Sequence, residues 1–145
     1  MTRHPDADTA DLLVVRNDLS ELARVGAWIN AWAQRHGVPA RTIERVDLCS
    51  TEVVTNIISY GYTDCATHEI SLRLDRRGEG LALEIGDDGN AFDPRQADEP
   101  RPAANLEDAK IGGWGIQILR RFSDELRYDR DGTQNRLTLI FTDRR

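Results

Sequence analysis

A chain of 145 residues is long enough for one compact domain and too short for two ordinary ones. Its composition, 39% apolar and 30% charged, excludes a disordered or collagen-like chain. With 19 basic and 25 acidic residues, the formal net charge of -6 argues against a nucleic-acid coat or a protein that binds anionic membranes. Lys110 is the only lysine, so few ammonium groups are offered for chemistry.

Cysteine usage and the N-terminus both indicate a cytoplasmic protein. Cys49 and Cys65 are too few for a disulfide framework or a structural zinc site. No segment approaches the roughly 18 apolar residues of a membrane span. Residues 1–10 form a polar, acidic tail without the apolar centre of a signal peptide. We therefore expect a single domain over residues 1–145, with no membrane and no direct nucleic-acid contact.

The first half of the chain predicts one strand and two helices. The apolar run Leu12–Val15 suits a short strand. Apolar residues at helical spacing then predict a helix that begins near Leu19 and ends before Gly37. A second helix is expected from about Ala40 to about Ser59.

The second half changes to a period of two. Apolar and polar residues alternate over 70–74 and again over 81–85, which predicts two strands joined by a turn at 76–80. Residues 87–110 have no sustained periodicity, and a gap of this length is typical of a functional lid, placed at about 93–112.

A short helix and two further strands complete the chain. The helix is expected over Ile116 to about Phe122, and the strands near Glu125–Tyr128 and Arg136–Phe141. Two helices ahead of a strand meander predict an α+β fold. The expected architecture is a two-layer sandwich, in which helices cover one face of a mixed, mainly antiparallel sheet.

The second predicted helix carries a polar pair opposite its apolar arc. Glu52 and Asn56 are four residues apart and share one face. Such a face is commonly solvated. Alternatively it looks into a ligand cavity, where the carboxylate accepts a proton and the amide oxygen coordinates Mg²⁺. The helix alone does not decide between these interpretations.

Two glycine-containing loops flank the predicted lid. Asp87 and Gly89 follow a strand, either as an ordinary turn or as a carboxylate that accepts from a ligand's amino group beside a closely approaching backbone. Gly112, Gly113 and Gly115 precede a helix, where backbone N–H groups favour an anion. A flexible hinge is the alternative for this second loop. It is neither a P-loop nor a Rossmann fingerprint.

In this order, the motifs resemble those of the GHKL (Bergerat-fold) ATPases, and among them the RsbW/SpoIIAB-type anti-sigma-factor serine/threonine protein kinases. The resemblance runs from about Leu12 to Phe141. Residues 51–56 look like the N-box, and residues 87–94 like the first glycine box. Residues 112–124 look like the second glycine box, and residues 135–139 like the last strand.

The resemblance implies a Bergerat (HATPase) fold that binds ATP and Mg²⁺, with a role for each matching residue. Glu52 would be the general base, and Asn56 would coordinate Mg²⁺. Asp87 would accept from the adenine amino group, supported by Thr138 directly or through water. The remaining assigned nucleotide contacts are Gly89, Ala91, Phe92, Lys110, Gly112, Gly113, Trp114 and Gly115.

Three of these residues need comment. Ala91 stands where relatives often have glycine or proline. Trp114 is bulkier than the aliphatic residue expected between the glycines. Lys110 either neutralises a phosphate or is a solvated loop lysine.

The implied function is an ATP-dependent serine/threonine kinase and anti-sigma factor. It would phosphorylate a STAS-domain anti-sigma-factor antagonist, sequester a sigma factor or another response regulator, and form a homodimer. A non-catalytic, ATP-gated binding module would use the same nucleotide residues and differs through Glu52. An ATPase or a histidine-kinase-derived catalytic domain is a third alternative. Against the latter, His36 lies too close to a helix-ending glycine to be its phosphorylated residue.

Overall fold

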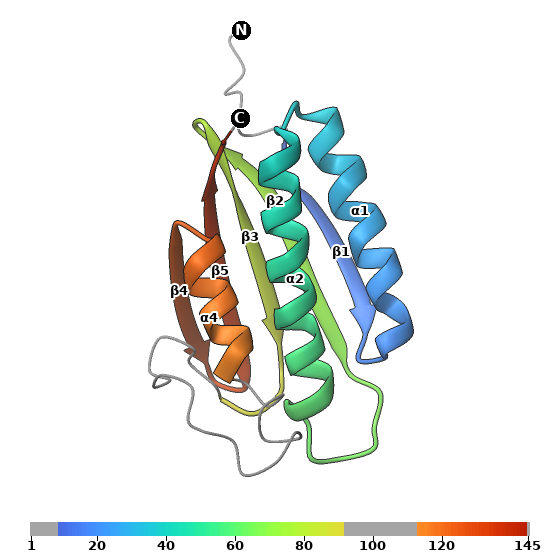
Figure 1. The fold of residues 1–145 in the computed structure, drawn as a ribbon. Coiled ribbons are helices and arrows are strands. Elements are labelled where there is room, and N and C mark those ends of the chain that lie inside the picture. Colours follow the sequence, from blue (N-terminus) through green and yellow to red (C-terminus); the bar gives the residue numbers. More distant parts are fainter. Residues whose placement is uncertain (1–8, 92–112, 145) are drawn as a thin grey trace, which may run out of the picture.

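The computed structural model describes residues 9–91 and 113–144, which form a five-stranded sheet and a layer of helices (Figure 1). The N-terminal elements are β1 (Asp11–Arg16), the 3-10 turn η2 (Leu19–Glu21), α1 (Leu22–Arg35) and α2 (Ala40–Tyr60). They are followed by β2 (Glu69–Arg77), β3 (Gly80–Asp87), α4 (Gly113–Phe122), β4 (Glu125–Asp131) and β5 (Gln134–Thr142).

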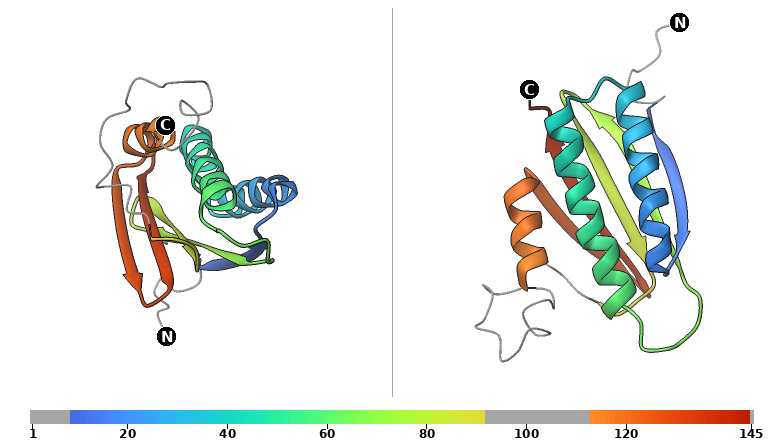
Figure 2. Two further views of the ribbon diagram at one scale, coloured as in Figure 1. Left: turned by 90° about the horizontal axis from the view of Figure 1, so that it is seen from below. Right: turned by 45° about the vertical axis from the view of Figure 1, so that its right-hand side comes forward.

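The sheet order is β1-β2-β3-β5-β4, and all four pairings among the described strands are antiparallel. The helices lie on one face of this sheet (Figure 2). The predicted α+β sandwich is therefore confirmed, while the expected mixture of strand directions is not seen in the described part of the chain. Each described neighbour along the sheet runs back against the last, so no parallel crossover is needed.

Alternation along the strands builds the core between the two layers. Ile70, Leu72 and Leu74 of β2 are fully buried, as are Leu83 of β3 and Leu139 of β5. Their intervening neighbours face the opposite side of the sheet because successive strand side chains alternate. The helix α1 contributes a matching stripe at helical spacing, made of Val25, Ile29, Trp32 and Ala33.

The 21-residue helix α2 carries Glu52 and Asn56, and its ends have clear causes. Pro39 precedes it with an extended backbone, and Gly61 follows it. A Cβ on Gly61 would lie 2.6 Å from the carbonyl oxygen of Ile57, so the chain turns there only with glycine. Cys49 lies on its buried face, where burial raises the pKa of the thiol to about 12, and both cysteines of the chain are free.

Arg45 links α2 to the ends of α4 and β5 by hydrogen bonds. Its guanidinium donates to the carbonyl oxygen of Phe122 at 3.1 Å and to the Asp124 carboxylate at 3.3 Å. It also donates to the carbonyl oxygen of Thr142. The C-terminal end of α4 and the end of β5 are therefore both hydrogen-bonded to one α2 side chain.

The sequence-based boundaries differ from the observed ones mainly at element ends. The first helix is preceded by a 3-10 turn, which Asp18 caps by accepting from the backbone N–H of Ser20 at 2.9 Å. The helix α4 begins at Gly113, three residues before its expected start. In the described residues, no helix combines the length and apolar character needed to cross a membrane.

Candidate functional site

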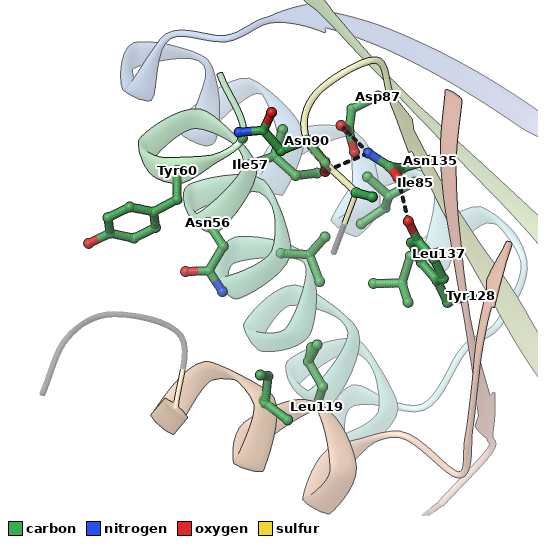
Figure 3. A pocket seen from close by; sticks show the side chains of 14 residues that line it. Asn56, Ile57, Tyr60, Ile85, Asp87, Asn90, Leu119, Tyr128, Asn135 and Leu137 are labelled. Atoms are coloured by element: carbon green, nitrogen blue, oxygen red, sulfur yellow. Dashed lines mark hydrogen bonds between the residues drawn. The ribbon is translucent and has the colours of Figure 1, made fainter. Parts of the chain in front are cut away.

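A pocket of about 220 Å³ lies between α2, α4 and the C-terminal part of β3 (Figure 3). Its walls are largely apolar, and its polar side chains gather in two places, one on α2 and one where β3 and β5 meet. The lining residues are Val53, Asn56, Ile57, Tyr60, Gly61, Ile85, Asp87, Asn90, Ala91, Ile116, Leu119, Tyr128, Asn135 and Leu137. An apolar pocket with few polar groups is typical of small-molecule binding.

Asp87 forms the first polar end of the pocket. The residue is only 7% exposed, at the last position of β3. Its Oδ1 atom accepts from the backbone N–H of Gly89 at 2.8 Å and from Nδ2 of Asn135 at 3.0 Å. No donor among the described residues reaches Oδ2, which leaves that oxygen for a ligand.

Asn135 is the centre of the hydrogen bonding around this carboxylate. It lies on β5 directly opposite Asp87 in the strand register and is 6% exposed. Its Nδ2 also donates to the carbonyl oxygens of Gly89 at 3.1 Å and Asn90 at 3.0 Å. Its Oδ1 accepts from the Tyr128 hydroxyl and, at 2.8 Å, from Nη1 of Arg130. Figure 3 shows Asn135 between Asp87 and Tyr128.

Close backbone contacts hold the loop after β3 against the end of α2. The backbone N–H of Asn90 donates to the carbonyl oxygen of Gly61 at 2.7 Å. A Cβ on Gly89 would lie 2.5 Å from that same oxygen and 3.0 Å from Oδ1 of Asp87. Glycine is required at position 89 because any side chain would collide with backbone there.

Asn56 forms the second polar end, on α2 and apart from the Asp87–Asn135 pair (Figure 3). Glu52 lies one turn before it, half-buried and outside the pocket lining. The two side chains share a flank of the helix, as the spacing predicts. In residues 9–91 and 113–144, no group of three or more His, Cys, Asp or Glu side chains could hold a metal. A hard cation here would therefore take its remaining oxygens from a ligand and from water.

The structure does not bring Thr138 to Asp87. Thr138 pairs with Glu84 in the register between β3 and β5, while the adjacent Leu137 pairs with Ile85 and lines the pocket. Because neighbouring strand residues face opposite sides, the Thr138 side chain is on the other face of the sheet. Asn135 supports Asp87 in its place. Asn135 is two residues before Leu137, so alternation along the strand places both side chains on the pocket face. This spacing is the signal that could have found Asn135 in the sequence.

The remaining predicted site residues lie close in sequence to the predicted lid. Ala91 lines the pocket and Gly89 supports it through its backbone. Phe92, Lys110 and Gly112 lie outside the described residues, as does the predicted lid at 93–112. Gly113, Trp114 and Gly115 form the first turn of α4 rather than a loop before it. Backbone N–H groups of a first turn lack intrahelical partners, so a ligand can accept from them.

An imidazole joins two loops beside the Asp87 end of the pocket. His68 approaches Asp64 Oδ1 at 2.7 Å through Nε2 and Asp88 Oδ1 at 3.2 Å through Nδ1. Its ring stacks on Tyr62 with centroids 4.1 Å apart. The hydrogen bond to Asp64 raises the pKa of His68 above its usual 6.5, with Asp88 adding to this effect. The same hydrogen bond lowers the pKa of Asp64 below 3.8.

This cluster predicts a pH-dependent contribution to stability. The raised pKa of His68 means that its contribution is complete below about pH 6.5 and is lost as the pH rises through the folded-state pKa. The lowered pKa of Asp64 makes its contribution complete above about pH 3.8 and lost on further acidification. The stability difference between wild type and His68→Gln should therefore be largest near pH 5–6 and shrink above neutrality. Urea unfolding across this range measures it, and a difference independent of pH would contradict the assignment.

Comparisons with known proteins show which family the chain is similar to. The sequence profile of the family described as "Histidine kinase-like ATPase domain" matches residues 15–141. The serine/threonine-protein kinase BtrW of Bordetella bronchiseptica is 37% identical over 112 residues, which cover 77% of this chain and 79% of that protein. The serine-protein kinase RsbW of Bacillus subtilis is 25% identical over 99 residues.

The coverage of these relatives is unequal. The matched segment spans 66% of this chain and 62% of the Bacillus subtilis protein. Among solved structures, that of the RsbU and RsbW domains of Rv1364c from Mycobacterium tuberculosis superimposes with a TM-score of 0.64 at 13% identity. It covers 92% of this chain and 32% of that one, and at this identity it supports the fold alone.

Proposed function

Because the chain belongs to the histidine kinase-like ATPase domain family, we propose that it is an ATP-dependent serine/threonine protein kinase. The single observation that carries the proposal is the pocket with Asp87 at one polar end and Asn56 at the other. Asp87 Oδ2 would accept from the adenine amino group, and the apolar walls would hold the faces of the base. The serine/threonine class is proposed from the kinase activities for which BtrW and RsbW are named.

The donor set of the pocket fits Mg-ATP. Asn56 offers an amide oxygen, a ligand that Mg²⁺ accepts when phosphates and water complete its shell. The first turn of α4 offers backbone N–H groups for phosphate oxygens. Bound Mg-ATP supplies the phosphoryl group to be transferred. The protein then has to position the acceptor and stabilise charge, which requires little covalent chemistry of its own.

The position of Glu52 supports a role as general base toward a protein hydroxyl. A serine or threonine on another protein arrives from solvent, and the pocket would already hold the nucleotide. A base for that hydroxyl belongs at the pocket's edge, one helical turn from the metal ligand. Glu52 occupies such a place, half-buried and just outside the lining. A carboxylate there accepts the hydroxyl proton as the oxygen attacks phosphorus.

The partners follow from the RsbW-type relatives. We propose a STAS-domain anti-sigma-factor antagonist as the protein substrate, and a sigma factor or another response regulator as the sequestered partner. A homodimer and a cytoplasmic location are part of the same proposal. The net charge of -6 accords with protein partners rather than nucleic acid.

Phosphoryl transfer to a candidate antagonist tests the function directly. The purified chain is incubated with γ-labelled ATP, Mg²⁺ and STAS-domain proteins encoded near its gene. We expect label on one of them, on serine or threonine, that disappears when EDTA replaces Mg²⁺. ATP binding without any transfer would overturn the kinase and leave an ATP-gated binding module. Absence of ATP binding would overturn both.

A further inference from the structure

The hydrogen bonds around Asn135 fix which way its side-chain amide faces. The NH₂ group points to three oxygens, of Asp87, Gly89 and Asn90. The amide oxygen points to two donors, the Tyr128 hydroxyl and Nη1 of Arg130. A rotated amide would set its oxygen against three acceptors and its NH₂ against two donors, so only one orientation satisfies every partner.

Both donors come from β4, the edge strand next to β5. Tyr128 is half-buried and lines the pocket, whereas Arg130 extends across to the loop after β3. Besides its bond to Asn135, Arg130 Nη1 donates to the carbonyl oxygen of Gly89 at 3.1 Å. One arginine therefore holds both the amide that supports Asp87 and the loop whose backbone N–H also supports it.

The amide orientation in turn fixes which oxygen of Asp87 faces a ligand. Nδ2 of Asn135 and the backbone N–H of Gly89 both bind Oδ1. This leaves Oδ2 as the acceptor for a ligand's amino group. Without these two donors the carboxylate could turn about its Cβ–Cγ bond, and neither oxygen would stay directed at a ligand's amino group.

We propose that Tyr128 and Arg130 are positioning residues that set base selectivity, acting through Asn135 to hold Asp87 in the orientation that recognises an exocyclic amino group. The inference rests on the proposed nucleotide site and adds to it a contribution from β4. Neither residue was assigned from the sequence. The order of contact runs from β4 through Asn135 to Asp87, from the exposed Arg130 and half-buried Tyr128 to two buried side chains. A hydrogen-bonded network of this kind stabilises one arrangement only when all members are present.

Base selectivity is the readout that separates positioning from general support of the fold. Equilibrium binding of ATP and of inosine triphosphate, which carries a carbonyl oxygen in place of the 6-amino group, gives the ratio of the inosine triphosphate Kd to the ATP Kd. Tyr128→Phe and Arg130→Gln should each weaken ATP binding about fivefold or more and change inosine triphosphate binding little, so the ratio falls. The double variant should lower it further.

The chain offers a matched control on the same strand. Arg127 is an exposed arginine whose ion pair is to Glu125, also exposed, so Arg127→Gln should leave the ratio within about twofold of wild type. Equal loss of both nucleotides in Tyr128→Phe and Arg130→Gln would indicate a structural role and overturn the inference. So would an unchanged ratio.

The binding experiment distinguishes failure of the proposed function from failure of this inference. If wild type binds neither nucleotide, the ATP site itself is wrong and both proposals fall. If wild type prefers ATP and the β4 variants keep that preference, only the inference fails. Tyr128→Phe removes one oxygen and keeps the ring in the pocket wall, so it tests the network even if Arg130→Gln unfolds.

Discussion

Glu52→Gln is expected to abolish phosphoryl transfer while leaving ATP affinity within about twofold of wild type. The substitution keeps the size of the side chain and removes the group that accepts the hydroxyl proton, which is worth about 10²–10⁴ in rate. Glu52 is outside the pocket lining, so the nucleotide should lose no direct contact. Single-turnover transfer to the antagonist and equilibrium ATP binding measure the two effects separately.

Asn56→Ala provides the contrast one turn along the same helix. Asn56 lines the pocket, so its removal should weaken Mg-ATP binding and thereby lower transfer as well. Magnesium-free nucleotide should bind this variant nearly as it binds wild type. Survival of transfer at a rate within tenfold of wild type in Glu52→Gln would show that Glu52 is not the base.

Asp87→Asn should invert the base preference of the pocket. The position of Oδ1 faces two donors, the backbone N–H of Gly89 and Nδ2 of Asn135. An asparagine at position 87 must place its oxygen there, and its NH₂ then takes the place of Oδ2. This puts a donor against the adenine amino group and a donor against the carbonyl oxygen of hypoxanthine. We expect ATP affinity to fall about 10- to 100-fold while inosine triphosphate gains.

Competition between the two nucleotides in one binding assay measures this inversion. Asp88→Asn is the neighbouring control, because Asp88 is exposed and contacts His68 rather than the pocket lining. It should keep the wild-type preference for ATP. An Asp87→Asn variant that binds ATP as tightly as wild type would refute the assignment of Asp87 to adenine.

The α+β fold could be predicted from the sequence because the spacing of apolar residues differs between helices and strands. The change from helical spacing to alternation after residue 68 separated the helices from the strand meander, and both long helices were placed within a few residues. The start of α4 was missed because Gly113 and Gly115 read as loop, although glycine is tolerated in a first turn whose N–H groups lack partners.

Residues of the pocket could be predicted where they belong to one sequence motif. Prediction failed where the contact depends on how two strands are aligned. Asn56 and Asp87 both line the pocket. Thr138 was assigned by resemblance, but alternation along β5 places its side chain on the face of the sheet away from the pocket. Asn135 is instead the residue of β5 that pairs with Asp87. Tyr128 and Arg130 were missed because their role depends on how β4 pairs with β5, which a single sequence does not specify.

The backbone contact between the end of α2 and the loop after β3 ties the helix that carries Asn56 to the loop beside Asp87. Asn90 is hydrogen-bonded to Gly61, and the lack of a side chain at Gly89 is what lets the two segments lie this close. The two polar ends of the site are thus held apart by main chain rather than by adjustable side chains.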